Sequence, residues 1–172
     1  TIVIADKLFH GYRINRFIEI INPIPGRMNI YRFKDKNIII DYAHTESAVE
    51  GTLAELSRII NSRMFIVCGC GGNREKEKRE KIGLILAKYD NVLLTNDNPR
   101  NENPLDIIND INKCIKPLPY ILDRKQAIIS CLDKMNSNEY LVILGKGNED
   151  YMEINNLKYP YSDLEVINEY FS

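Results

Sequence analysis

The sequence predicts an α/β fold: a Rossmann-like, mostly parallel sheet with helices on both faces and one antiparallel edge strand. Short apolar runs alternate with segments of helical length, which is typical of βαβ units. These runs are rich in Ile, Val and Leu without alternating polar residues, as strands covered on both faces require. We expect strands at 29–33, 37–42, 64–69, 91–95, 120–122 and 140–145, and helices at 45–61, 75–89, 103–115, 124–135 and 162–171.

The beginning of the chain differs from the rest. Residues 2–21 predict a helix, a turn at Gly11 and a second short helix, and "NPIPGR" (22–27) carries two prolines and a glycine, which indicates a linker. We therefore divide the chain into a leading helical piece, 1–23, and a principal domain, 24–172. Because the sequence starts with Thr inside a helical pattern, we expect it to be a fragment of a longer polypeptide.

Local signals justify the elements that follow. Residues 29–33 and 37–42 predict a hairpin, or an edge strand beside a first core strand. Thr45 is a candidate N-cap for the helix at 45–61, and Asn103 caps the helix at 103–115, with Pro104 in the first turn, where proline is tolerated. The charged run "EKEKREK" (75–81) predicts a solvated helix face. The segment "GKGNED" (145–150) could be a type II turn with a surface lysine, as the plainer alternative to a ligand-binding loop.

Composition excludes several classes of protein. The chain has 172 residues, 44% of them hydrophobic and 27% charged, and a formal net charge of −1. So neutral a chain offers no electrostatic case for binding nucleic acid or an anionic membrane. No apolar stretch approaches the roughly 20 residues of a spanning helix. Cys68 and Cys70 have no second Cys/His pair nearby, so we expect reduced thiols in a cytoplasmic protein, and no metal site.

Polar residues follow four of the predicted strands, where open α/β sheets bind ligands. Arg74 and Arg100 are forked donors suited to carboxylates, whereas Asp97 and Glu149 suit ammonium groups and Asn98 can serve either. Because the carboxyl ends of parallel strands meet at one edge of the sheet, we expect these residues to form a pocket for an amino acid that is zwitterionic at both ends. Each group of polar residues also has a plainer interpretation.

The plainer interpretations are local structural roles. Asp41 could cap the next helix, and His44 could be an ordinary loop residue. The segment "CGCGG" (68–72) could be a flexible turn, although its glycines allow a close backbone approach to a ligand. It is neither a dinucleotide fingerprint nor a phosphate loop.

Several motifs, taken in order, resemble those of the Mur ligases: "PGRM" (25–28), "DYAHT" (41–45), "CGCGGNREKEKR" (68–79), "TNDNPRNENP" (95–104), "DR..AI" (123–128), "GKGNEDY" (145–151) and "YSD" (161–163). The resemblance extends from Pro23 to the end of the chain. It is strongest to the branch that adds a diamino acid to UDP-N-acetylmuramoyl-L-alanyl-D-glutamate (UDP-MurNAc-L-Ala-D-Glu), and "DNPR" resembles the version that uses meso-diaminopimelate.

The resemblance implies a role for each matching residue. Arg27, Asp41 and His44 are expected near ATP, with Asp41 accepting from the ribose hydroxyls. Arg74, Asn98 and Arg100 are expected to grip diaminopimelate, with Arg100 on its distal carboxylate. Asp97 would support their loop. Gly145 and Glu149 are expected to bind its distal ammonium. Lysine lacks the second carboxylate and would leave the charge of Arg100 unpaired. The cost of that unpaired charge would make the site select diaminopimelate over lysine.

Three positions depart from the family pattern. Asn73 stands where Asp is usual, Asn148 where His is usual, and Asn29 where Glu is frequent. Asn148 can form hydrogen bonds but cannot titrate, so a protonation role there is in doubt.

The resemblance also implies what the chain lacks. The phosphate loop, the magnesium ligands and the UDP-sugar domain would belong to central and N-terminal domains, so residues 1–23 would be the tail of the ATPase domain. ATP and Mg²⁺ would serve the full-length enzyme, and we expect neither on this fragment, nor any turnover by it. The alternatives are a lysine-adding ligase, a ligase of the folylpolyglutamate or cyanophycin synthetase type, and a stand-alone amino-acid-binding module.

Overall fold

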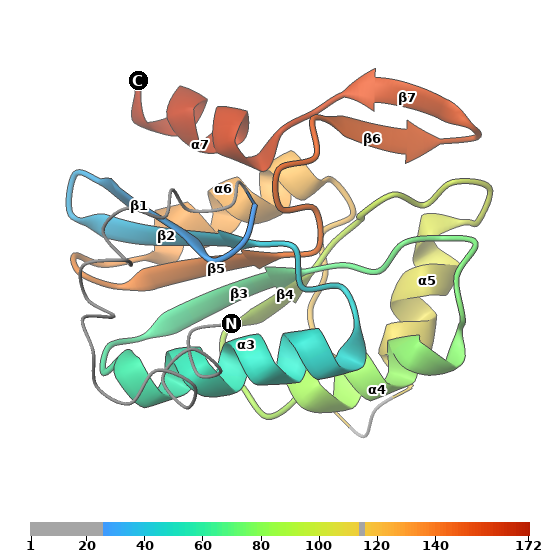
Figure 1. Cartoon of the computed structure of the whole chain (residues 1–172), viewed down its shortest axis with the longest axis horizontal. Helices are drawn as coiled ribbons and strands as arrows, with labels where there is room; N and C mark the ends of the chain where they lie inside the picture. The colour runs from blue at the N-terminus through green and yellow to red at the C-terminus, as the bar shows by residue number, and fades with distance from the viewer. Residues whose placement is uncertain (1–25, 114–115) are drawn as a thin grey trace, which may run out of the picture.

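The computed structural model describes residues 26–113 and 116–172 and confirms the predicted fold class (Figure 1). A five-stranded sheet has the order β1-β2-β5-β3-β4, parallel except for β1 at one edge. Its strands are β1 (Asn29–Phe33), β2 (Lys36–Asp41), β3 (Met64–Cys68), β4 (Val92–Leu94) and β5 (Tyr140–Leu144). The helices are α3 (Glu46–Ile59), α4 (Glu77–Leu86), α5 (Pro104–Ile111), α6 (Arg124–Lys134) and α7 (Asp163–Phe171).

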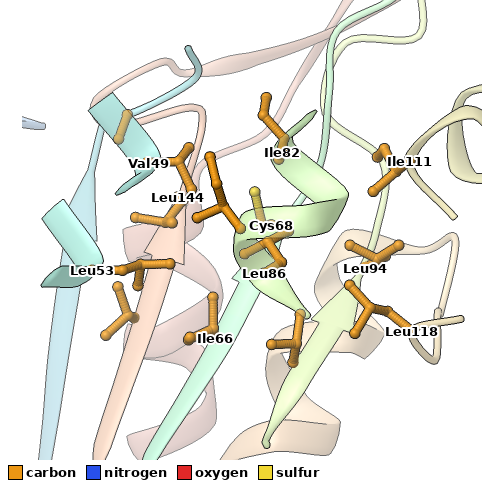
Figure 2. Close-up of a cluster of buried hydrophobic side chains, with 14 of the residues drawn as sticks. Val49, Leu53, Ile66, Cys68, Ile82, Leu86, Leu94, Ile111, Leu118 and Leu144 are labelled. Atoms are coloured by element: carbon orange, nitrogen blue, oxygen red, sulfur yellow. The ribbon is translucent and has the colours of Figure 1, made fainter. Parts of the chain in front are cut away.

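Alternating side chains of the core strands pack on opposite faces of the sheet. Ile39 and Ile66 face α3, α4 and α5, in the cluster that Figure 2 shows, whereas their neighbours Ile38 and Val67 face α6 and α7. This period of two places an apolar residue on each face in turn, so the strands need no polar positions. Helices α3 and α4 accordingly lie below the sheet in Figure 1, and α6 and α7 lie above it.

The predicted caps form as the sequence indicates. Thr45 Oγ1 accepts a hydrogen bond from the Ala48 amide at 3.3 Å, and Asn103 Oδ1 accepts one from Leu105 at 2.9 Å, with Pro104 in the first turn. These oxygens satisfy amides that have no partner within the helix. The caps therefore fix where the loops after β2 and β4 end.

Two predictions about strands need correction. Residues 120–122 form no regular strand: Tyr120 makes one isolated bridge to Leu94, beside backbone hydrogen bonds such as Ile121 N to the Leu94 carbonyl at 3.0 Å. A separate antiparallel hairpin, β6 (Tyr151–Ile154) and β7 (Leu157–Pro160), was not predicted. Its turn is Asn155–Asn156, at φ 51° and 62°, a conformation that asparagine tolerates. The expected helices at 2–21, and the linker except for residues 26–27, lie outside the described residues.

A buried ion pair attaches the last helix to the loop edge of the sheet. Arg124, at the start of α6, donates from Nε and Nη2 to the two carboxylate oxygens of Asp163 on α7, both at 2.8 Å. Its Nη2 also donates to the Leu144 carbonyl at 3.0 Å, and Nη1 to that of Asn96 at 3.3 Å. Both charged side chains are fully buried. One guanidinium thus joins α6, α7, the end of β5 and the loop after β4.

Candidate functional site

The parallel strands end on the same side of the sheet, at the right in Figure 1, and a cavity of about 330 Å³ opens there. This volume is in the range of small-molecule sites. Most of the predicted site residues line it: His44, Arg74, Asp97, Asn98, Arg100, Gly145 and Glu149. Arg27 and Asp41 are not among the lining residues. The convergence expected from the strand exits is therefore present, and the roles of the individual residues stay predictions.

Asn98 is held by contacts that decide which end of its amide faces which partner. Its Oδ1 accepts from Lys146 Nζ at 3.0 Å and from the Glu153 amide at 2.9 Å. Its Nδ2 donates to Glu149 Oε2 at 2.8 Å. Because the oxygen already accepts twice, the group that Asn98 offers to a ligand is its amide donor.

The plainer interpretation of "GKGNED", a turn with a surface lysine, does not hold for Lys146. Its side chain is fully buried, and Nζ lies 3.0 Å from Glu149 Oε2 and 3.9 Å from Asp97 Oδ1. Burial raises the pKa of Asp97, and the charges of Arg124 and Lys146 oppose that rise. The lysine therefore compensates two carboxylates and fixes Asn98, so it organises the floor of the cavity.

Arg100 adopts a backbone conformation that is uncommon for a side chain with a Cβ. Its φ is 51°, in the left-handed region. The β6–β7 hairpin holds it there, since Arg100 N donates to the Glu153 carbonyl at 3.0 Å and its carbonyl accepts from Asn155 N at 2.8 Å. Arg100 Nη1 donates to the Gly72 carbonyl at 2.9 Å, and Nε lies 2.9 Å from Glu153 Oε2. The unpredicted hairpin thus completes the site.

Two glycines allow the loops to approach one another closely. A Cβ at Gly72 would lie 1.9 Å from the Pro99 carbonyl oxygen, and one at Gly145, where φ is +111°, would lie 2.4 Å from Asp97 Oδ2. Neither position accepts a side chain without a shift of the DNPR loop. The glycines of "CGCGG" and "GKG" are therefore structural requirements of the cavity.

Arg74, in the loop after β3, and Arg79, in the first turn of α4, have different surroundings. Arg74 is exposed, lines the cavity and makes no hydrogen bond or ion pair with the described residues. Arg79 is buried and donates to Glu102 Oε1 and Oε2, each at 2.8 Å, and to Asp110 Oδ2 at 3.0 Å. The run 75–81 is therefore not wholly solvated, because one of its residues anchors the loop after β4. Hydrogen bonds from Arg79 lower the pKa of Glu102 to about 2.

The residues predicted near ATP cluster around Tyr42 and His44, which both line the cavity. The Arg27 guanidinium lies 4.9 Å from the Tyr42 ring centroid, and the rings of Tyr42 and His44 meet edge to face at 4.6 Å. Asp41 is buried and accepts from the amides of Met28 at 2.7 Å and Ala43 at 2.8 Å. An exposed cation beside two aromatic rings suits a nucleotide, and Asp41 organises the turn beneath them.

A metal site and a membrane span have no support in the described part of the chain. No group of three or more His, Cys, Asp or Glu within 26–113 and 116–172 could hold a metal ion. No helix in these ranges has the length and apolar character needed to cross a membrane.

Comparison with known proteins decides the family. The model described as Mur ligase, glutamate ligase domain, matches residues 26–147. The chain belongs to the Mur ligase family. The resemblance inferred from the motifs is thereby confirmed, and the match spans the five-stranded sheet and ends at residue 147, just before Glu149.

Relatives of this Mur ligase chain agree with one another. The UDP-N-acetylmuramoyl-L-alanyl-D-glutamate–2,6-diaminopimelate ligase of Aquifex aeolicus is 41% identical over 96% of the chain, and that of Rickettsia felis is 39% identical over all of it. A solved structure of a ligase with the same name covers 90% of the chain with a TM-score of 0.79 and 32% identity. A folylpolyglutamate synthase from Thermotoga maritima, 21% identical with a TM-score of 0.54, shares the fold. The chain spans about a third of the length of these relatives.

Proposed function

We propose that the chain is the C-terminal, amino-acid-accepting domain of an ATP-dependent ligase that adds meso-diaminopimelate to UDP-MurNAc-L-Ala-D-Glu in peptidoglycan synthesis. The observation that carries this proposal is one cavity that holds both Arg74 and Arg100 and also Glu149. Relatives named as 2,6-diaminopimelate ligases support it. Residues 1–23 would end the central ATPase domain, residues 24–172 would form the accepting domain, and the full-length enzyme would act in the cytoplasm.

The cavity offers separate partners for the charges at the distal end of diaminopimelate. Arg100, with the amide donor of Asn98 and the unpaired guanidinium of Arg74, would bind carboxylate. Glu149 and the Gly145 carbonyl would bind the distal ammonium. These contacts would fix the amino acid so that its other amine points away from the cavity floor toward the activated substrate. The chain would thus contribute positioning, not a catalytic base.

ATP would activate a carboxylate of the UDP-sugar dipeptide for attack by that amine. On this chain, Arg27 and the Tyr42–His44 pair would meet the nucleotide, and Asp41 would hold their turn or accept from the ribose. Mg²⁺ would be held by the remaining domains of the full-length enzyme. The 172 residues alone would therefore have no ligase activity.

Calorimetric titration of the full-length ligase tests this assignment. We expect meso-diaminopimelate to bind at least tenfold more tightly than lysine. Arg100→Ala should weaken diaminopimelate binding about 10- to 100-fold, since a hydrogen bond to a charged group contributes about 1.5–3 kcal/mol. It should leave lysine binding nearly unchanged.

The matched control is Arg58→Ala, which removes an exposed arginine paired only with Glu55 on α3. That variant should bind both amino acids as the wild type does. Equal affinity of the wild type for the two amino acids would overturn the specificity and favour a lysine-adding ligase.

A further inference from the structure

Arg100 already has a carboxylate partner before any ligand binds. Its Nε lies 2.9 Å from Glu153 Oε2, and the two side chains are 19% and 23% exposed. Glu153 is on β6, in the hairpin that the strand pattern did not predict, and it follows the "GKGNEDY" motif by two residues. The guanidinium proposed to bind the distal carboxylate is therefore not an isolated cation in the empty cavity.

Contacts other than the Glu153 side chain also orient Arg100. The Gly72 carbonyl accepts from Nη1 at 2.9 Å, with the Asn98 carbonyl 3.5 Å from the same nitrogen. The backbone of Arg100 is fixed by hydrogen bonds to Glu153 O and Asn155 N, which do not involve the Glu153 side chain. The carboxylate of Glu153 thus adds charge to a guanidinium that other contacts already orient.

We propose that Glu153 is a resident counter-ion of Arg100 that competes with the distal carboxylate of the amino acid and thereby limits discrimination against lysine. This inference rests on the proposed function. When diaminopimelate binds, its carboxylate must share the guanidinium with Glu153, and two carboxylates beside one cation repel each other. When lysine binds, the Arg100–Glu153 pair is undisturbed, so the arginine is not left without a partner.

Titration of the full-length ligase with Glu153→Gln tests the competition. We expect this variant to bind meso-diaminopimelate about two- to fivefold more tightly, the size of a partly exposed ion pair. Lysine affinity should stay within twofold of the wild type or fall. Glu153→Ala should likewise strengthen diaminopimelate binding without strengthening lysine binding. Because alanine has no hydrogen-bond donor, this result would show that the gain does not come from the glutamine amide.

The matched control is Glu55→Gln, which removes an equivalent charge from the exposed surface of α3. It should bind both amino acids as the wild type does. Diaminopimelate binding that is unchanged or weaker in both Glu153 variants would overturn the inference and leave the proposed function intact. A wild-type enzyme that binds neither amino acid would overturn the inference together with the proposed function.

Discussion

Lys146→Met tests whether the buried ammonium organises the cavity floor. The side chain is fully buried, and it contacts Asn98 Oδ1 and Glu149 Oε2, both at 3.0 Å, with Asp97 Oδ1 at 3.9 Å. Methionine fills a similar volume, so the change removes charge with little loss of packing. It leaves two carboxylates facing each other without the cation that separates them.

The expected loss in the free energy of unfolding is about 3 kcal/mol. Removing one partner of a buried ion pair costs about 3–5 kcal/mol, because the other charge stays buried and uncompensated. The lower end applies here, since Glu149 is 20% exposed and can recruit water. Urea denaturation of the 172-residue chain at neutral pH measures this difference.

A second substitution on the same cluster separates charge from packing. The double variant Lys146→Met/Glu149→Gln should have a free energy of unfolding about 1 kcal/mol or more above that of Lys146→Met alone, because the uncompensated Glu149 carboxylate is gone. Lys158→Met is the matched control, since this exposed lysine lies over the Tyr151 ring at 3.8 Å and should contribute less than about 1 kcal/mol. A loss below about 1 kcal/mol for Lys146→Met, or no recovery in the double variant, would refute the reasoning.

Two further predictions concern the loops around the cavity. Hydrogen bonds from Arg79 lower the pKa of Glu102 from 4.5 to about 2, so this stabilisation is complete above pH 4.5 and is lost as the pH falls toward 2. Glu102→Gln should therefore reduce the free energy of unfolding by about 1–3 kcal/mol at pH 7 and by much less at pH 2.5, and equal losses at both would contradict this account. Gly145→Ala should destabilise the chain by about 2 kcal/mol or more and abolish amino-acid binding, because φ is +111° and Cβ would meet Asp97. Thermal unfolding measures the change against Gly51→Ala, an open site on α3 that should be neutral or stabilising, and a neutral Gly145→Ala would be inconsistent with the close approach.

The core strands and most helices were predictable because their signals are local. A short apolar run such as Ile38–Ile40 and a cap such as Thr45 determine an element within a few residues. The segment 120–122 has an apolar pattern too, yet it meets β4 through a single bridge. The sequence of 120–122 does not show that β4, the strand beside it, is only three residues long. The β6–β7 hairpin could have been found from Asn155–Asn156, a pair that favours a tight turn.

The polar groups of the site were predictable in kind, but their pairing was not. Parallel strands bring their carboxyl ends to one edge, so charged residues there must gather. Whether a lysine in "GKG" points outward or into the floor depends on Asn98, which is 48 residues earlier in the chain. Arg79 likewise looks like its charged neighbours, and its burial depends on Glu102 and Asp110 from the loop and helix after β4. Such long-range contacts leave no trace in a local pattern.

The Arg124–Asp163 pair has a consequence for the order in which the site can be built. Until Asp163 has been added to the growing polypeptide, the guanidinium beneath the loop after β4 has no counter-charge in α7, although it already reaches the Leu144 and Asn96 carbonyls. A nascent chain therefore cannot complete this ion pair until its last helix has been synthesised.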